Sequence, residues 1–191
     1  MRNARAGLAL VMALAALLSG CSVAVEGAPA AAASGGAGLA ATAFVDSRAR
    51  FSLVPPRGWT PDASGRQDTA VVFLHSRPDP APPGPFLPNI NVVVLPAGAD
   101  LAVTVVGARR ELGDLTAYRP VEDETASLAG GLPAHVLGGT FTRAGYALRN
   151  LQLFTVSGGS TFVVTGTALA DRWDDYRALF DASLHTLTVP A

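Results

Sequence analysis

The sequence predicts an α+β domain in which an antiparallel β-sheet packs against helices, and two observations lead to this fold class. Short runs rich in β-branched and aromatic residues alternate with glycine and proline turns through most of the chain, as is typical of strands joined by hairpins. Two further segments carry apolar residues at helical spacing, and each has to bury its apolar side on a sheet.

The expected strands follow from these runs and from the turn residues that end them. Gly145 and the pair Gly158–Gly159 supply the positive φ angles that tight hairpin turns require, so the strands on either side should form an antiparallel meander. The expected strands are residues 50–54, 70–75, 89–96, 118–128, 134–143, 146–156 and 161–169, with a short closing strand at 186–189.

A proline-rich segment, residues 76–88, separates the second and third of these strands. It holds six prolines, which is too many for regular secondary structure. We therefore expect a stiff, exposed loop at this point of the fold.

Two amphipathic helices are expected. The first begins at the N-cap Asp100 and runs to about Gly113, although the β-branched residues 103–106 argue mildly against a helix. The second covers residues 171–185, and we expect Asp171 to cap it. The apolar stripe of the first helix consists of Leu101, Val105, Ala108 and Leu112, and that of the second consists of Trp173, Tyr176, Phe180 and Leu184.

The N-terminus has the features of a secretory signal peptide. Arg2 and Arg5 form a charged start, and residues 6–18 are apolar or small throughout. As a helix, this apolar run spans only about 20 Å, which is short of the ~30 Å hydrocarbon core of a bilayer. A cleaved signal therefore explains the segment better than a permanent transmembrane helix.

The segment Leu18-Ser19-Gly20-Cys21 ends this signal and resembles a bacterial lipobox, with an aliphatic residue, two small residues and then cysteine. Small residues let the peptide lie extended in a protease cleft, and the thiol of Cys21 accepts a diacylglyceryl group before cleavage after Gly20. Cys21 is the only cysteine of the chain, so it forms no internal disulfide. We expect residues 1–20 to be a lipoprotein signal peptide. Cys21 should then carry two or three acyl chains, such as diacylglycerol and palmitate, which hold a protein stably on a membrane.

Residues 21–43 are expected to form the lipidated N-terminus and a flexible tether. Ala, Gly and Ser dominate this stretch, and Pro29 and the glycines interrupt any polyalanine helix, with a helical stalk as the alternative. The globular domain should then cover residues 44–191, a length that suits one core.

Several motifs follow one another in the order found in one known family. These are the lipobox, the low-complexity tether, Gly58-Trp59, the proline-rich segment, and residues 128–141 with the pattern G-x-P-A-x-x-L-G-G. Together they resemble the mycobacterial and actinobacterial LpqN/LpqT lipoproteins over residues 44–190, although the tether is shorter and poorer in threonine. All 14 basic residues are arginine, which suits a GC-rich, actinobacterium-like source. The resemblance implies a PsbP-like fold, an antiparallel sheet in an α/β/α-type sandwich, and a binding or assembly module.

No pattern in the sequence indicates a catalytic, metal-binding or cofactor-binding residue. The three histidines, His75, His135 and His185, lack the spacing of a metal-binding pair, and we expect each to be structural. The acidic run at residues 122–124 is expected to protect an edge strand from aggregation, with weak cation capture as the alternative. A net charge of −1 and the absence of a basic cluster argue against nucleic acid as a partner.

These features predict a lipoprotein anchored to the cell membrane by lipid, on its extracytoplasmic face in the cell envelope. We expect no enzyme activity, and a domain that binds an envelope or host protein through its edge strands and residues 77–88. A carrier of an apolar envelope lipid or glycolipid, held between the sheet and the last helix, is the alternative. It is based on the hydrophobic content of 49% and on the aromatic residues of that helix, which core packing also explains.

Overall fold

The computed structural model describes residues 30–31 and 38–190 of the chain. The predicted signal peptide, Cys21 and most of the predicted tether lie outside these residues. The strands are β1 (Ala30–Ala31), β2 (Thr42–Val45), β3 (Ser52–Leu53), β4 (Thr60–Asp62), β5 (Val71–Leu74), β6 (Asn89–Pro96), β7 (Arg119–Ser127), β8 (Pro133–Arg143), β9 (Tyr146–Ser157) and β10 (Ser160–Leu169). The helices are α1 (Leu101–Gly113) and α2 (Trp173–Leu184), and 3-10 turns lie at Arg66–Asp68, Ala129–Gly131 and Ala170–Arg172.

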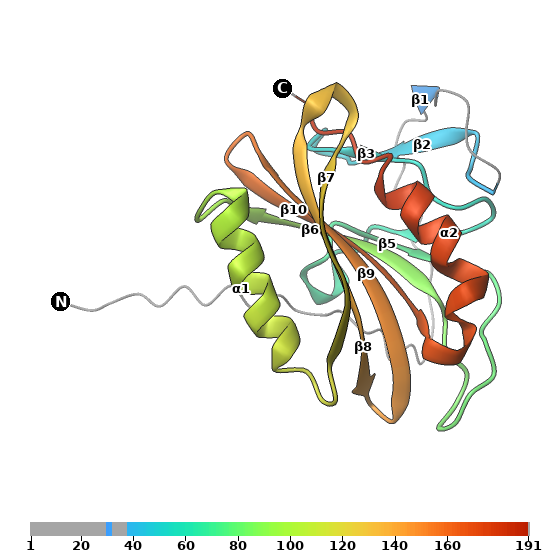
Figure 1. The fold of residues 1–191 in the computed structure, drawn as a ribbon. Helices are drawn as coiled ribbons and strands as arrows, with labels where there is room; N and C mark the ends of the chain where they lie inside the picture. The colour runs from blue at the N-terminus through green and yellow to red at the C-terminus, as the bar shows by residue number, and fades with distance from the viewer. Residues whose placement is uncertain (1–29, 32–37, 191) are drawn as a thin grey trace.

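The described strands form two sheets. The large sheet is antiparallel, with seven strands in the order β4-β5-β6-β10-β9-β8-β7, and the small sheet has the order β1-β2-β3. Figure 1 shows α1 on one side of the large sheet and α2 on the other, with the small sheet beside α2. The predicted α+β fold, an antiparallel sheet between helices, is confirmed. Neither α1 nor α2 is long and apolar enough to cross a membrane.

The strands β8, β9 and β10 form the predicted meander. In the turn from β8 to β9, Ala144 and Gly145 have φ angles of 49° and 84°, and in the next turn Gly158 and Gly159 have φ angles of 55° and 73°. Positive φ at both central residues is the backbone shape whose twist matches that of the flanking strands. The glycines therefore set the register that brings distant polar residues together on the sheet.

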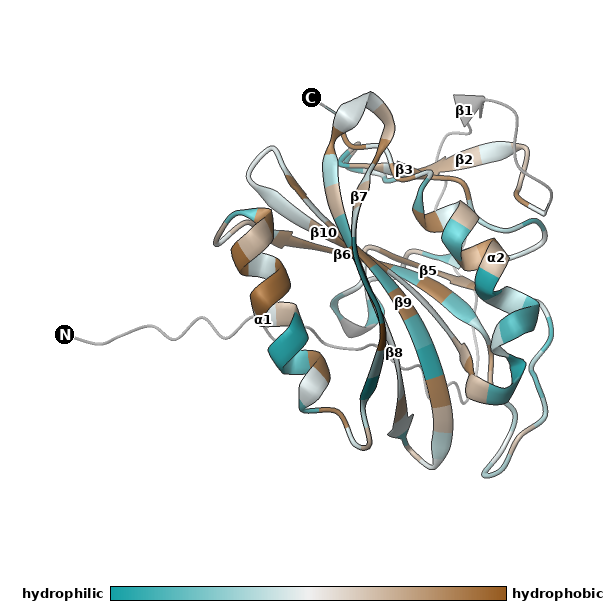
Figure 2. Ribbon diagram, viewed as in Figure 1, coloured by the Kyte–Doolittle hydropathy of each residue, from teal (hydrophilic) through white to brown (hydrophobic). Residues whose placement is uncertain are grey.

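The larger apolar core lies between the large sheet and α2. Trp173, Tyr176 and Phe180 of α2 are buried, and the ring of Phe180 contacts both of the others and Trp59. On the opposite face, α1 buries Thr104, Val105, Ala108 and Leu112, so its predicted inward stripe is largely correct. In Figure 2, brown and teal segments alternate along β9, and the middle of β7 is teal.

The two helices differ in how they begin. The carboxylate of Asp100 accepts a hydrogen bond from the backbone N–H of Val103 at 2.9 Å, so the predicted N-cap of α1 is confirmed. The predicted cap at Asp171 is wrong, because residues 170–172 form a 3-10 turn and α2 starts only after Arg172. Asp175 in the first turn of α2 instead forms an ion pair with Arg172 at 2.7 Å.

The end of the predicted tether lies against the domain. Leu39 is 4% exposed, and the backbone N–H of Ala40 donates to the carbonyl oxygen of Pro55 at 2.8 Å. β2 begins at Thr42, before the predicted domain start at residue 44. The physical reason is that Leu39 brings a large apolar side chain into a stretch otherwise composed of small residues.

The proline-rich loop is more tightly held than expected from its composition. Asp79 and Phe86 are buried, and their backbones exchange hydrogen bonds of 2.7 and 2.8 Å. Phe86 packs with Phe141, Leu148 and Leu169 on the α1 side of the sheet. Residues 76–78 before Asp79 are exposed, and so are residues 80, 82, 83 and 85 between the two buried residues.

Candidate functional site

A buried group of polar side chains lies on the face of the large sheet that carries α1. Cross-strand pairing sets β6, β10 and β9 side by side, and two neighbouring rows of three polar residues follow from their register. Each of the six residues is at most 6% exposed, and none is charged. We call them the polar rows: Asn91–Thr165–Gln152 and Asn89–Thr167–Asn150.

Protein groups satisfy only part of the polar rows. The side-chain amide of Asn89 donates to the carbonyl oxygen of Leu87 at 3.0 Å, and Oδ1 of Asn150 accepts from the backbone N–H of Gly139 at 3.2 Å. Nδ2 of Asn150 and Oε1 of Gln152 are buried without a hydrogen-bond partner. An unsatisfied donor or acceptor costs roughly 1–3 kcal/mol unless water or a ligand completes it. The rows are therefore suited to a neutral group that both donates and accepts hydrogen bonds.

The polar rows separate two apolar clusters on this side of the sheet. Along β10, Val163 belongs to the cluster under α1, Leu169 belongs to the cluster around Phe86, and the two threonines lie between them. Leu115 and Tyr118, from the connection between α1 and β7, pack against both clusters. The α1 side of the sheet is thus an apolar layer interrupted by one polar strip.

The α2 side of the sheet is filled by aromatic side chains. Gly166 lies directly under Phe180, because a Cβ atom at Gly166 would be 2.5 Å from the ring. The guanidinium of Arg149 lies 4.8 Å from the ring centroid of Trp173 and forms an ion pair with Glu122. The aromatic residues that suggested a lipid-binding helix are therefore core residues.

A buried hydrogen bond holds the proline-rich loop to α2. The hydroxyl of Tyr176 donates to Oδ1 of Asp79 at 3.0 Å, while Oδ2 of Asp79 is buried without a partner. Burial, together with this hydrogen bond and the charge of Asp79, raises the pKa of Tyr176 to about 12. The phenol therefore stays protonated, and remains a donor, at physiological pH.

The predicted acidic run lies on β7, which is an edge strand of the large sheet as expected. Its middle residue, Asp123, accepts hydrogen bonds from Arg109 of α1 and from His135 of β8, each at 2.7 Å. The hydrogen bonds of Arg109 and His135 lower the pKa of Asp123 to about 2. This carboxylate therefore ties the helix to the sheet edge.

The other two histidines contact backbone carbonyl groups. Nδ1 of His75 lies 2.6 Å from the carbonyl oxygen of Arg77, and Nδ1 of His185 lies 2.8 Å from that of Asp181. Within residues 30–31 and 38–190, no group of three or more His, Cys, Asp or Glu side chains is placed to hold a metal ion.

Sequence reasoning did not single out the polar rows, and the predicted lipobox residues Leu18, Ser19, Gly20 and Cys21 lie outside the described residues. The signal for the rows is present in the strand sequences, where Asn-Ile-Asn, Asn-Leu-Gln and Thr-Gly-Thr alternate polar with apolar or small residues. Such alternation is usually that of a strand with one face in water. Only the pairing of three strands shows that these polar residues are neighbours and buried.

The strand order and the helix on each face define an α+β fold that is similar to the fold of PsbP. No protein-family model matches the chain, and no curated protein matches its sequence. Among solved structures, the cyanobacterial PsbP (CyanoP) of Synechocystis sp. PCC 6803 is 18% identical, with a TM-score of 0.54 over 82% of this chain and 95% of that one. The Pseudomonas aeruginosa protein PA94 is 17% identical, with a TM-score of 0.56 over 78% of this chain and 96% of that one.

The fold is also similar to that of LpqN from Mycobacterium tuberculosis, a protein involved in cell envelope biogenesis. The two chains are 22% identical, with a TM-score of 0.57 over 73% of this chain and 83% of LpqN. The predicted likeness to an LpqN/PsbP-like protein is therefore confirmed at the level of the fold.

Proposed function

We propose that this chain is a lipid-anchored lipoprotein of the cell envelope whose α+β domain is a non-enzymatic protein-binding module. The observation that carries the proposal is the combination of a lipobox, Leu18-Ser19-Gly20-Cys21, with a fold shared by LpqN. Because LpqN is involved in cell envelope biogenesis, its likeness supports the envelope as the location. The lipobox supports attachment to the cell membrane on the extracytoplasmic face.

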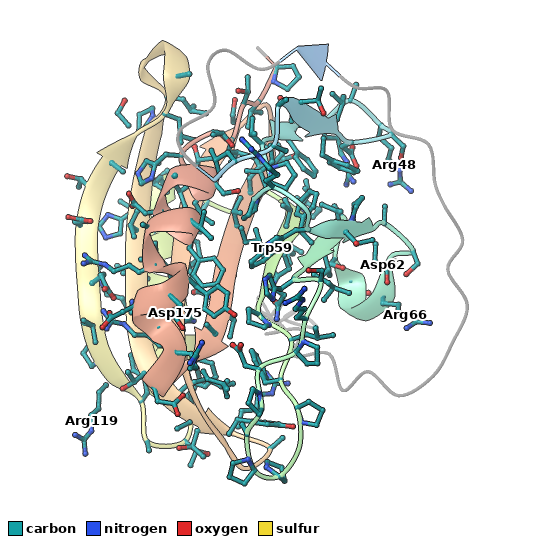
Figure 3. The ribbon with its side chains drawn as sticks, turned by 90° about the vertical axis from the view of Figure 1, so that its right-hand side faces the viewer. Arg48, Trp59, Asp62, Arg66, Arg119 and Asp175 are labelled. Atoms are coloured by element: carbon teal, nitrogen blue, oxygen red, sulfur yellow. The ribbon has the colours of Figure 1, made fainter. Side chains whose placement is uncertain are left out.

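The edge strand β7 supports the protein-binding role. It is nine residues long, and most of its side chains are exposed, including Val121 at 53%. Figure 3 shows Arg119 pointing away from the start of this strand. An edge strand can pair with an extended segment of a partner, and charged side chains restrict which segments fit. We therefore place the partner, an envelope or host protein, on β7, with the exposed residues of the proline-rich loop as a second contact.

The anchor is tested with Cys21→Ala in the full chain. We expect this variant to lose labelling by a radioactive or clickable fatty acid and to keep its signal peptide, because the acylated thiol is needed before cleavage. Ser22→Ala is the matched control and should be labelled like the natural chain. Labelling that persists in Cys21→Ala would overturn the anchor.

The binding surface is tested by crosslinking in cells that produce the full chain. Glu124→Lys reverses a charge on the exposed edge of β7, and Thr142→Lys adds the same side chain on β8 as a control. We expect the first variant alone to lose the crosslinked envelope partners of the natural chain. If both variants keep every partner, β7 is not the binding surface.

A second candidate function is the binding of an envelope glycolipid, and the polar rows are the observation that favours it. The buried, unpartnered amide atoms of Asn150 and Gln152 match a polar, uncharged head group. The aromatic residues of α2 belong to the apolar core on the other side of the sheet. Native mass spectrometry with extracted envelope lipids tests this function. If Thr165→Val loses the bound lipid and the exposed control Thr142→Val keeps it, the result supports glycolipid binding at the polar rows. Equal binding by both variants would exclude the polar rows as the binding site.

A further inference from the structure

The outer face of α1 exposes two valines. Val103 is 59% exposed and Val106 is 47% exposed, and they are two of the three large apolar side chains that are exposed among the described residues. At 100° per residue, residues 103, 106 and 110 lie within about 60° of one another. They are centred opposite the buried stripe of Val105, Ala108 and Leu112. In Figure 2, α1 has brown turns, and the turn below them in the same helix is teal.

The stability of the domain does not explain these valines. Valine is a weak helix former, because its branched side chain loses rotamer freedom against the preceding turn. At an exposed helical position it also gains little from burial in the core. Residues that strengthen an isolated helix, such as alanine, glutamate or arginine, would serve better at both positions. A contact with another molecule gives these side chains the burial that the domain lacks.

The face is self-complementary about a two-fold axis. If two α1 helices pack antiparallel with the axis midway between residues 103 and 106, Val103 of one copy lies opposite Val106 of the other. The same register sets Arg110 opposite residues 99–100, next to the exposed carboxylate of Asp100. Small residues flank the contact, since Ala99, Ala102 and Gly107 lie beside the valines. A two-fold arrangement therefore repeats both the apolar contact and the charge pair.

We propose that α1 pairs with α1 of a second copy of this chain, antiparallel, through Val103, Val106 and an Arg110–Asp100 ion pair on each side. This inference rests on the proposed lipid anchor, because one helix pair buries well under the ~1,200 Å² of a stable interface. Two copies held on one membrane meet at a far higher effective concentration than in solution. The pair is weak in solution and forms on the membrane.

The position of the chain entry favours a second copy over the lipid surface as the occupant. The described chain joins the domain at β1, which pairs with β2 of the small sheet, and at Gly38, which lies against Leu179 of α2. Figure 1 shows α1 on the opposite side of the large sheet. The outer face of α1 is therefore on the far side of the domain from the point where the predicted tether arrives.

Disulfide crosslinking tests the pair on the full, lipidated chain in vesicles. Because Cys21 is the only cysteine and its thiol is acylated, Val103→Cys and Val106→Cys each introduce one free thiol. We expect a mixture of these two variants to form a disulfide-linked dimer at about five times the yield of Ala178→Cys, whose residue is exposed on α2. Adding Arg110→Glu to both variants should reduce the yield to that of Ala178→Cys, because the introduced carboxylate would face the carboxylate of Asp100.

For chains that are held on the vesicles, three outcomes overturn the proposal: equal dimer yields for the mixture and Ala178→Cys, a yield that Arg110→Glu leaves unchanged, or crosslinks from α1 only to other proteins or lipid. A second arm separates failure of the pair from failure of the anchor. In it, Cys21→Ser chains with an N-terminal histidine tag are bound to vesicles that contain nickel-chelating lipid. A dimer in this arm but not with the natural chain contradicts the anchor alone, and no dimer in either arm contradicts the pair.

Discussion

Gly138, Gly139 and Gly166 each make room for a particular neighbour on the large sheet. A Cβ atom at Gly138 would lie 2.3 Å from Oε2 of Glu122, and one at Gly139 would lie 2.6 Å from the ring of Tyr118. The Gly-Gly pair that contributed to the family resemblance therefore has a packing role on both faces of the sheet. Sequence alone showed the pair but not its neighbours, because Glu122 and Tyr118 reach it from another strand and a loop.

Gly166→Ala should destabilise the domain by about 1–3 kcal/mol, because a methyl group 2.5 Å from the buried ring of Phe180 overpacks the core. Gly107→Ala is the control. Nothing lies within 4 Å of a Cβ atom at Gly107, and alanine there should stabilise α1 by up to about 1 kcal/mol. Urea unfolding followed by tryptophan fluorescence measures both, and equal midpoints would show that α2 does not press on Gly166.

Tyr176→Phe should destabilise the domain by about 1–3 kcal/mol, because it removes the hydroxyl that donates to the buried carboxylate of Asp79. Tyr146→Phe removes a hydroxyl from a half-buried tyrosine on β9 and should change the free energy of unfolding by less than about 0.5 kcal/mol. An equal effect of the two substitutions would mean that the hydrogen bond does not hold the loop.

At the scale of elements, local sequence patterns predicted the strands whose signals lie within their own segments. Residues 89–96 form a strand with the predicted bounds, because β-branched residues and a closing proline mark it within the segment itself. β2 and β4 are four and three residues long, and each depends on a partner strand elsewhere in the chain, so no local signal marks them. The cap at Asp171 was wrong for a related reason, since a 3-10 turn delays the start of α2.

The link between α1 and β7 should make stability depend on pH. The pKa of Asp123 is about 2 in the folded protein and about 3.9 in an unfolded chain, so the folded state favours the charged form. The contribution of Asp123 to the free energy of unfolding is complete above about pH 5 and is lost as the pH falls from about 4 to 2. Asp123→Asn should therefore lose less stability than the natural chain between pH 5 and pH 2.

Urea unfolding at both pH values measures this difference, with Glu124→Gln on the same strand as the control. The control should keep the pH dependence of the natural chain. If Asp123→Asn keeps it as well, then Arg109 and His135 do not stabilise the carboxylate in solution.

At the scale of the whole molecule, the fold class and the meander could be predicted, but the candidate site could not. The polar rows combine three strands whose neighbours are set by the whole sheet, and β6 pairs with β10 across more than 60 residues of intervening chain. Composition marked residues 38–43 as tether because alanine and glycine dominate them. Their contacts with residues 55–57 depend on the finished domain.

The start of the folded domain can be measured with two shortened chains. A chain that begins at residue 38 should be more stable than one that begins at residue 44 by about 2–4 kcal/mol, because the shorter one lacks the buried Leu39 and part of β2. Leu39→Ala in the longer chain should account for most of this difference. Equal stability of the two chains would mean that residues 38–43 belong to the tether and not to the folded domain.

The small sheet determines where mechanical tension enters the domain. A pull transmitted through the predicted tether arrives first at β1, which pairs with β2. It then reaches Gly38, whose carbonyl oxygen accepts a hydrogen bond from Arg57, and Ala40 with its bond to Pro55. Beyond them, Phe51 and Leu53 are buried in the main core and resist extraction. Tension on the predicted tether should therefore peel away the chain only as far as β3. The tether lengthens under load, while the large sheet and both helices keep their shape.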